Sequence, residues 1–146
     1  LDEGDVQRVL SYSGAMIGSD GIPDDQHPHP RLWGTFPRVL GHYSRDLGLM
    51  PLEEAVHRMT GLPAAQFGFK DRGELRKGAF ADIVIFNSKT VIDSATFDRP
   101  TTPAIGIDSV YVNGGVVWQN GKSTGDRPGR PIYLGDTNRG KNVRPR

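Results

Sequence analysis

A carboxylate, Asp20, follows a short apolar run and lies between Gly18 and Gly21. The run, residues 15–17, predicts a buried strand because it is short, apolar and ends at a glycine. A carboxylate at the end of a buried strand can face a cleft and pass a proton between water and a leaving group. Ser-Asp-Gly is also a common turn, in which the aspartate caps the backbone. From the residues alone, turn capping is the favoured interpretation of Asp20.

A long segment rich in proline and histidine follows, up to Arg38. It has too few apolar residues in phase for a helix and too many prolines for a central strand. Loops of this length are usually either functional or disordered. The aromatic residues Trp33 and Phe36 can anchor the segment, so the sequence predicts an ordered loop.

Two histidines of this segment, His27 and His29, form a His-x-His pair that invites a metal interpretation. The flanking prolines leave little freedom to aim both rings at one ion, so an exposed loop is favoured, with His29 at the mouth of a site. Arg38, with Trp33 and Phe36, either lines a substrate pocket or pins the loop. The sequence does not choose between these two roles.

Other polar pairs are less informative. Glu53 and His57 are spaced i and i+4, so they share a helix face and could hold a metal, but a single pair of this kind is more often a surface contact. His42 and Tyr43, like Arg38, could either line a substrate pocket or pin the loop, and the sequence does not choose between these roles. None of these pairs predicts a site by itself.

The first half of the chain has the periodicity of helices. A short helix is expected over residues 6–10 with Asp5 as its cap, and another over residues 39–47 that ends at Gly48. The clearest helix follows Pro51, with an apolar stripe, and ends at Gly61. A shorter helix over residues 62–68 repeats this design.

Near residue 69 the pattern changes to that of β structure. The unbroken apolar run 83–86 predicts a strand that is covered on both faces. Asn113-Gly114 lies between two β-rich runs and predicts a hairpin, because this pair favours the type I′ turn. Asn120-Gly121 predicts a second turn. The polar tail 135–146 is expected to be disordered.

Composition restricts the function further. The chain of 146 residues is long enough for one domain, and its net charge of +1 argues against a nucleic-acid partner. It contains no cysteine, which excludes disulfides and thiolate chemistry and fits the cytoplasm. No apolar run approaches the ~20 residues that span a membrane. The opening residues have neither an initiator methionine nor the pattern of a signal peptide, so we expect a fragment of a longer protein.

Several long motifs carry a family resemblance: the stretch from Met16 to Gly41, the helical stretch 46–64 and the β-rich half as far as Gly129. They resemble the C-terminal portion of the N-acyl-D-amino-acid deacylases (D-aminoacylases) of the amidohydrolase superfamily, whose chains are several times longer. Residues 72–86 are similar to a signature that many amidohydrolases share. Residues 93–97 and 125–129 resemble the deacylases more narrowly, and they look structural.

The resemblance implies an α/β fold: the C-terminal part of a metal-dependent (β/α)8 barrel, with the C-terminal strands of its small β-sandwich domain. Residues 1–70 would supply the last barrel strand, the active-site loop and the terminal helices. Residues 71–134 would form the β domain, and 135–146 the polar tail.

The resemblance also implies an activity for the parent protein: zinc-activated water hydrolyses an N-acyl-D-amino acid to a carboxylate and a free D-amino acid. Asp20 would lie near the zinc and shuttle the proton, while His29 and Arg38 are candidates for binding the substrate. The family's other zinc ligands, a Cys and further His residues, come from earlier strands. This fragment is therefore expected to be inactive alone, and to associate with the upstream part of the protein or with itself.

Two alternatives remain at this stage. One is an amidohydrolase that acts on a cyclic amide or ureide, which the match over residues 31–41 disfavours. The other is a non-catalytic β module that associates with another chain.

Overall fold

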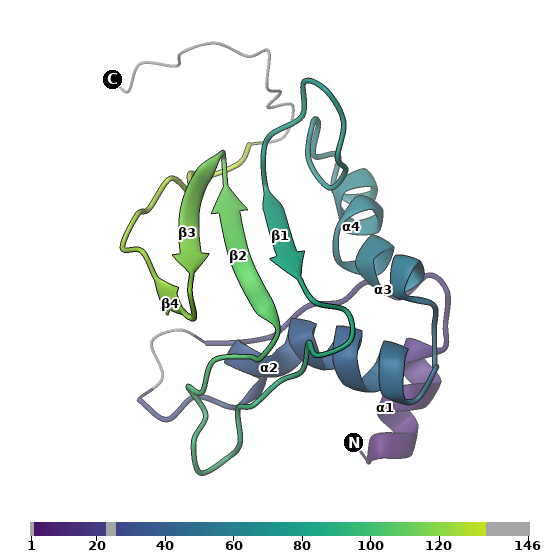
Figure 1. The fold of residues 1–146 in the computed structure, drawn as a ribbon. Coiled ribbons are helices and arrows are strands. Elements are labelled where there is room, and N and C mark those ends of the chain that lie inside the picture. Colours follow the sequence, from purple (N-terminus) through teal and green to yellow (C-terminus); the bar gives the residue numbers. More distant parts are fainter. Residues whose placement is uncertain (1, 23–25, 134–146) are drawn as a thin grey trace.

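The computed structural model describes residues 2–22 and 26–133 of the chain (Figure 1). Helices form the first half and an antiparallel sheet forms the second, with β1 as the strand nearest α3 and α4 in this view. The elements, in order, are α1 (Glu3–Leu10), α2 (Arg31–Arg38), the π-helix η1 (Val39–Asp46), α3 (Leu52–Met59), α4 (Gly61–Gln66), β1 (Ile83–Phe86), β2 (Ile107–Val112), β3 (Gly115–Gln119) and β4 (Lys122–Ser123).

Helix α1 begins earlier than predicted. Its N-cap is Asp2, whose carboxylate accepts a hydrogen bond of 2.9 Å from the backbone N–H of Asp5. The prediction of Asp5 as the cap is therefore wrong. Asp5 lies inside the first turn, where a negative charge is favourable, and it pairs with Arg8 at 3.1 Å.

The expectation of a loop up to Arg38 is wrong from Arg31 onward, because α2 begins there. Pro30 occupies the N-cap with a φ of −50°, a value that suits the start of a helix. Pro37 lies inside α2 and has no N–H for the helix ladder. Two residues later the chain continues as the π-helix η1, which ends before Gly48 as expected, with Gly48 at a φ of +61°.

Helix α3 confirms the clearest helical prediction, with Pro51 at its N-cap. Its end differs slightly from the expectation, because Thr60 breaks the helix and Gly61 already begins α4. The chain leaves α4 through Gly68, whose φ of +68° is the left-handed conformation that glycine adopts at helix ends.

The core is centred on η1. Val39, Leu40 and Tyr43 pack with Met50, Ala55 and Val91, a set that includes residues of α3 and of the segment after β1. Val91 is fully buried. The second half of the chain therefore contributes to the core of the first half.

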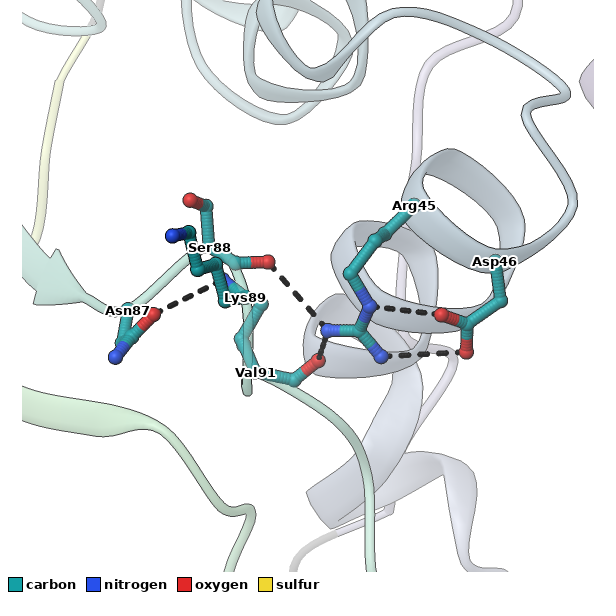
Figure 2. A network of polar contacts seen from close by, with 6 residues as sticks. All are labelled: Arg45, Asp46, Asn87, Ser88, Lys89 and Val91. Atoms are coloured by element: carbon teal, nitrogen blue, oxygen red, sulfur yellow. Dashed lines mark hydrogen bonds and ion pairs between the residues drawn. The ribbon is translucent and has the colours of Figure 1, made fainter.

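The backbone of η1 lies directly against this segment. A Cβ atom at Gly41 would overlap the carbonyl oxygen of Val91, so only glycine fits there. Figure 2 shows that Arg45 of η1 donates a 2.6 Å hydrogen bond to the same carbonyl oxygen. Asp46 accepts two further hydrogen bonds from Arg45, at 2.7 and 3.2 Å, and these lower the pKa of the Asp46 carboxyl.

The sheet has the order β1-β2-β3-β4, and all its pairs are antiparallel. The predicted hairpin is confirmed: β2 and β3 are joined by Asn113 and Gly114, with φ values of +48° and +83°. The second predicted turn, Asn120-Gly121, joins β3 to β4 with φ values of +54° and +76°.

Strand β1 is less covered than predicted. Val84 is 50% exposed and Ile85 is 47% exposed, so the expectation of cover on both faces is wrong for the chain as described. Successive side chains of a strand point to opposite faces, so each face of β1 carries one half-exposed side chain. In addition, β1 lies at the end of the sheet order, and no described strand pairs with its outer edge.

The predicted strand at residues 15–17 is not part of a sheet in the described structure. An apolar run becomes a strand only where a neighbouring strand can pair with it, and no described strand lies there. The N–H of Ile17 instead donates to the carbonyl of Arg58 in α3, at 3.1 Å. The tail 135–146, with its expected disorder, lies outside the described residues.

None of the helices described is both long enough and apolar enough to cross a bilayer.

Candidate functional site

Asp20 lies in the irregular segment between α1 and α2, and its carboxylate is 83% exposed. Its φ of +50° is a left-handed conformation that aspartate tolerates better than most residues. The turn is capped by Ser19, whose hydroxyl oxygen accepts from the N–H of Gly21 at 3.3 Å. Ser19 therefore provides the cap that the sequence had favoured for Asp20, and the Asp20 carboxylate is left for other contacts.

The partner of Asp20 is Arg31, at the start of α2. Its Nη2 lies 2.9 Å from Oδ2 of Asp20, and its Nε donates to the Asp20 backbone carbonyl, also at 2.9 Å. Sequence reasoning missed this residue. A usable signal was present: a cation at the start of a helix with no acid in its first turn is unfavourable there unless another carboxylate neutralises it.

The two histidines both contact Phe97 of the second half. The ring of His29 meets the ring of Phe97 edge-on, at 5.0 Å between centroids and 79° between planes. Nδ1 of His29 accepts a hydrogen bond of 3.1 Å from the backbone N–H of Arg31. Nε2 of His27 lies 3.0 Å from the carbonyl oxygen of Phe97. These contacts place His29 beside the partner of Asp20 and give both rings a role in attaching the loop.

Arg38 belongs to a second polar group. Its Nη1 lies 3.5 Å from Oδ2 of Asp93, and its guanidinium carbon lies 5.5 Å from the centre of the Tyr43 ring. Partial burial opposes the charge of Arg38, but the hydrogen bond to Tyr43 and the Asp93 carboxylate outweigh it and raise the Arg38 pKa. Tyr43 is 6% exposed, and this burial raises its pKa despite the hydrogen bond from Arg38. His42 faces Glu3 of α1 at 3.8 Å.

The segment 93–97 therefore packs against α2 and the loop before it. A Cβ atom at Gly34 of α2 would lie 3.1 Å from Cβ of Asp93, a close approach. Trp33 and Phe36 do not anchor the loop through burial, because they are 40% and 44% exposed. The segment up to Arg38, which the sequence predicted to be a loop anchored by these aromatic residues, is instead ordered by the formation of α2 and by its contacts with segment 93–97.

No cluster of three or more His, Cys, Asp or Glu side chains that could hold a metal ion occurs in residues 2–22 and 26–133. His27 and His29 are directed to Phe97, and the spaced pair of Glu53 and His57 is exposed on α3. The described residues thus provide the Asp20 carboxylate paired with the Arg31 guanidinium, but they do not form a metal centre by themselves.

Comparison with known proteins decides the family. The family model described as "Amidohydrolase family" matches residues 12–118, which is well over half of the chain. The chain belongs to the amidohydrolase family. The matched region of this amidohydrolase chain includes Asp20, Arg31 and all of segment 93–97.

Three relatives from Alcaligenes xylosoxydans xylosoxydans are similar to most of this amidohydrolase chain. A D-aminoacylase is 63% identical over 132 residues, covering 90% of the chain and 27% of the relative. An N-acyl-D-glutamate deacylase is 52% identical over 130 residues, covering 89% and 26%, and an N-acyl-D-aspartate deacylase is 47% identical over 136 residues, covering 93% and 27%. The chain therefore spans only about a quarter of the length of these relatives.

Solved structures of proteins with the same names also match this chain. The crystal structure of a D-aminoacylase matches with a TM-score of 0.84 at 63% identity, covering 86% of this chain and 27% of that one. An N-acyl-D-glutamate deacylase from Bordetella bronchiseptica, complexed with zinc and a phosphonate inhibitor, matches with a TM-score of 0.80 at 52% identity, covering 84% and 26%. A further D-aminoacylase structure is described as having a binuclear metal centre.

The raised pKa of Tyr43 predicts a pH dependence. A group whose pKa is higher in the folded state stabilises the protein fully below its unfolded pKa of about 10 and loses that contribution as the pH rises through the folded value. We therefore expect wild type to lose stability relative to Tyr43→Phe as the pH rises above about 10. Urea unfolding of both proteins between pH 8 and pH 11 measures this difference, and parallel curves would contradict it.

Proposed function

We propose that this chain is the C-terminal part of an N-acyl-D-amino-acid deacylase that hydrolyses linear amides of D-amino acids. The identity of 63% to a D-aminoacylase supports this activity. The names of the three Alcaligenes relatives all refer to D-amino-acid amides, and none refers to a cyclic amide or ureide. These names make the linear substrate the better assignment.

The parent would be a (β/α)8 barrel with a small β-sandwich domain. Residues 1–70 would contribute the last strand, the active-site loop and the terminal helices of the barrel, and residues 71–134 strands of the β domain. In that barrel, the run 15–17 would find the neighbouring strands that the described chain lacks. Asp20 would then follow a strand at its carboxyl end, where barrel enzymes gather their catalytic residues.

Asp20 is assigned as the general acid–base residue of this hydrolysis. The observation that carries the assignment is its contact set: Ser19 caps the turn, so the exposed Asp20 carboxylate is available for proton transfer and is oriented by Arg31. Asp20 would take a proton from the attacking water and deliver it to the departing amine. His29 and Arg38 are assigned to substrate binding, and His29 lies beside Arg31 through its hydrogen bond.

The residues described here do not make a zinc site. Zinc in proteins takes about four ligands, and the described residues bring no group of three candidates together. Zinc, present in the Bordetella relative, would therefore be held by ligands from the upstream part of the parent, with Asp20 near it. Because the whole chain also lacks cysteine, any thiolate ligand must come from that part.

The expected partner is the upstream part of the same protein, or a second copy of this chain. Strand β1 supports this proposal, because its outer edge has no described partner and its side chains Val84 and Ile85 are half exposed. An apolar strand with an unpaired edge is a template for pairing with another strand.

The first prediction from this function concerns the full-length parent. Asp20→Asn keeps the shape of the side chain and removes the base, so we expect kcat to fall about 10²–10⁴-fold with N-acetyl-D-methionine. Asp108→Asn, which changes an exposed carboxylate of β2, is the matched control and should retain activity. Near-normal turnover by Asp20→Asn would remove this residue from the mechanism.

The second prediction concerns the isolated chain. Added zinc should not produce deacylation, because the described residues supply no complete ligand set. The assay compares the chain and the full-length protein with N-acetyl-D-methionine, before and after zinc is added. Turnover proportional to the concentration of the isolated chain would show that the metal site has been misplaced.

The third prediction concerns assembly. The exposed β1 edge should cause the isolated chain to self-associate or to pack poorly, since burying apolar surface contributes about 25 cal/mol per Å². Light scattering measures the mass of the particles, and near-UV circular dichroism measures fixed packing around the aromatic residues. A monodisperse, well-packed monomer would contradict this expectation.

A further inference from the structure

Arg58 of α3 is a buried cation that the proposed chemistry does not use. Its side chain is 5% exposed, and its Nε donates to Oε1 of Glu54 at 2.6 Å. Its Nη1 donates to two carbonyl oxygens at the end of α1, those of Leu10 at 2.6 Å and Tyr12 at 3.0 Å. A buried charge is tolerated only when it is paired and hydrogen-bonded, and Arg58 meets both conditions.

The carbonyl of Leu10 explains why a donor is useful here, because the last carbonyls of a helix have no partner within the helix and a basic side chain can satisfy them. The carbonyl of Tyr12, which lies beyond the helix, also accepts from the N–H of Ala15 at 3.0 Å, so Arg58 adds a second hydrogen bond there. Arg58 reaches both from a different helix with one nitrogen, while its Nε is oriented by Glu54. The side chain therefore joins the end of α1 to α3.

Arg58 also anchors residues 11–19, the segment that connects α1 to Asp20. Among the described residues, the hydrogen bonds that join residues 11–19 to elements beyond α1 all involve Arg58. Its guanidinium holds the carbonyl of Tyr12, and its own backbone carbonyl accepts from the N–H of Ile17 at 3.1 Å. Asp20 follows Ile17 by three residues, which at ~3.5 Å per residue places it within about 10 Å of this anchor.

We propose that Arg58 is a positioning residue for Asp20, acting through residues 11–19. This inference rests on the proposed function, in which Asp20 transfers the proton. Arg31 holds Asp20 from the side of α2, and Arg58 holds the approaching chain from the side of α3. Because a catalytic group displaced by ~1 Å can lose about 10²-fold in rate, loss of one of these anchors affects catalysis directly.

The chain offers a matched control in Arg45. Like Arg58, it pairs with a nearby carboxylate and donates to a backbone carbonyl of a distant segment, with Asp46 and Val91 as its partners (Figure 2). Its contacts join η1 to the segment after β1 and do not involve residues 11–19. A change at Arg45 therefore reports the cost of losing a guanidinium contact without losing the anchor of Asp20.

The test uses the full-length protein with N-acetyl-D-methionine. Arg58→Gln should lower kcat about 10–10²-fold with little change in KM, because Asp20 acts in the chemical step and not in binding. Hydrogen–deuterium exchange of the peptide covering residues 11–21 should become faster in this variant. Arg45→Gln should keep kcat near wild type and leave exchange in that peptide unchanged. This should hold even if Arg45→Gln lowers the melting temperature as much as Arg58→Gln does.

Glu54→Gln is the milder variant for the case in which Arg58→Gln does not fold. It keeps the guanidinium and removes the carboxylate that orients it, so a smaller loss of kcat and faster exchange in the same peptide are expected.

An equal loss of kcat in the Arg45 and Arg58 variants would overturn the inference, and so would faster exchange with unchanged kcat. Normal turnover by a folded Arg58→Gln or Glu54→Gln protein, alongside an inactive Asp20→Asn protein, would overturn this inference while leaving the proposed function intact.

Discussion

The close contact between η1 and the segment at Val91 is the constraint on which the rest of the described structure depends. Gly41 allows the two backbones to touch, and Val91 fills the centre of the core. This contact makes the helical half and the β-rich half share one core. It also places segment 93–97, which follows directly, against α2 and the residues near Asp20.

The site is consequently assembled from both halves of the chain. Arg31 and His29 come from the first half, whereas Phe97 and Asp93 come from the second. The motif around residues 93–97, which looks structural in the sequence, contacts both candidate substrate-binding residues: Phe97 meets His29 of the loop, and Asp93 pairs with Arg38 of α2. A short family motif can therefore bear on activity without containing a catalytic residue.

Sequence patterns predicted what depends on local preference and failed where distant contacts decide. The hairpin at Asn113-Gly114 and the helix after Pro51 were predictable, because turn chemistry and apolar periodicity act over a few residues. Helix α2 was not, since its prolines read as loop residues and its packing partner is distant in sequence. The pairing of Asp20 with Arg31 was missed because it depends on how α2 is placed.

The π-helical geometry of η1 has a consequence for how this region tolerates insertions and deletions. Each residue of an α-helix advances the chain by about 100° around the axis. In η1 the hydrogen bonds reach the fifth residue, so each residue advances the chain by somewhat less. Removing one residue from η1, with its spacing kept, would rotate every side chain beyond the deletion by nearly that angle. Arg45 would then turn away from Val91, so the length of this helix is fixed by the direction of one side chain at its end.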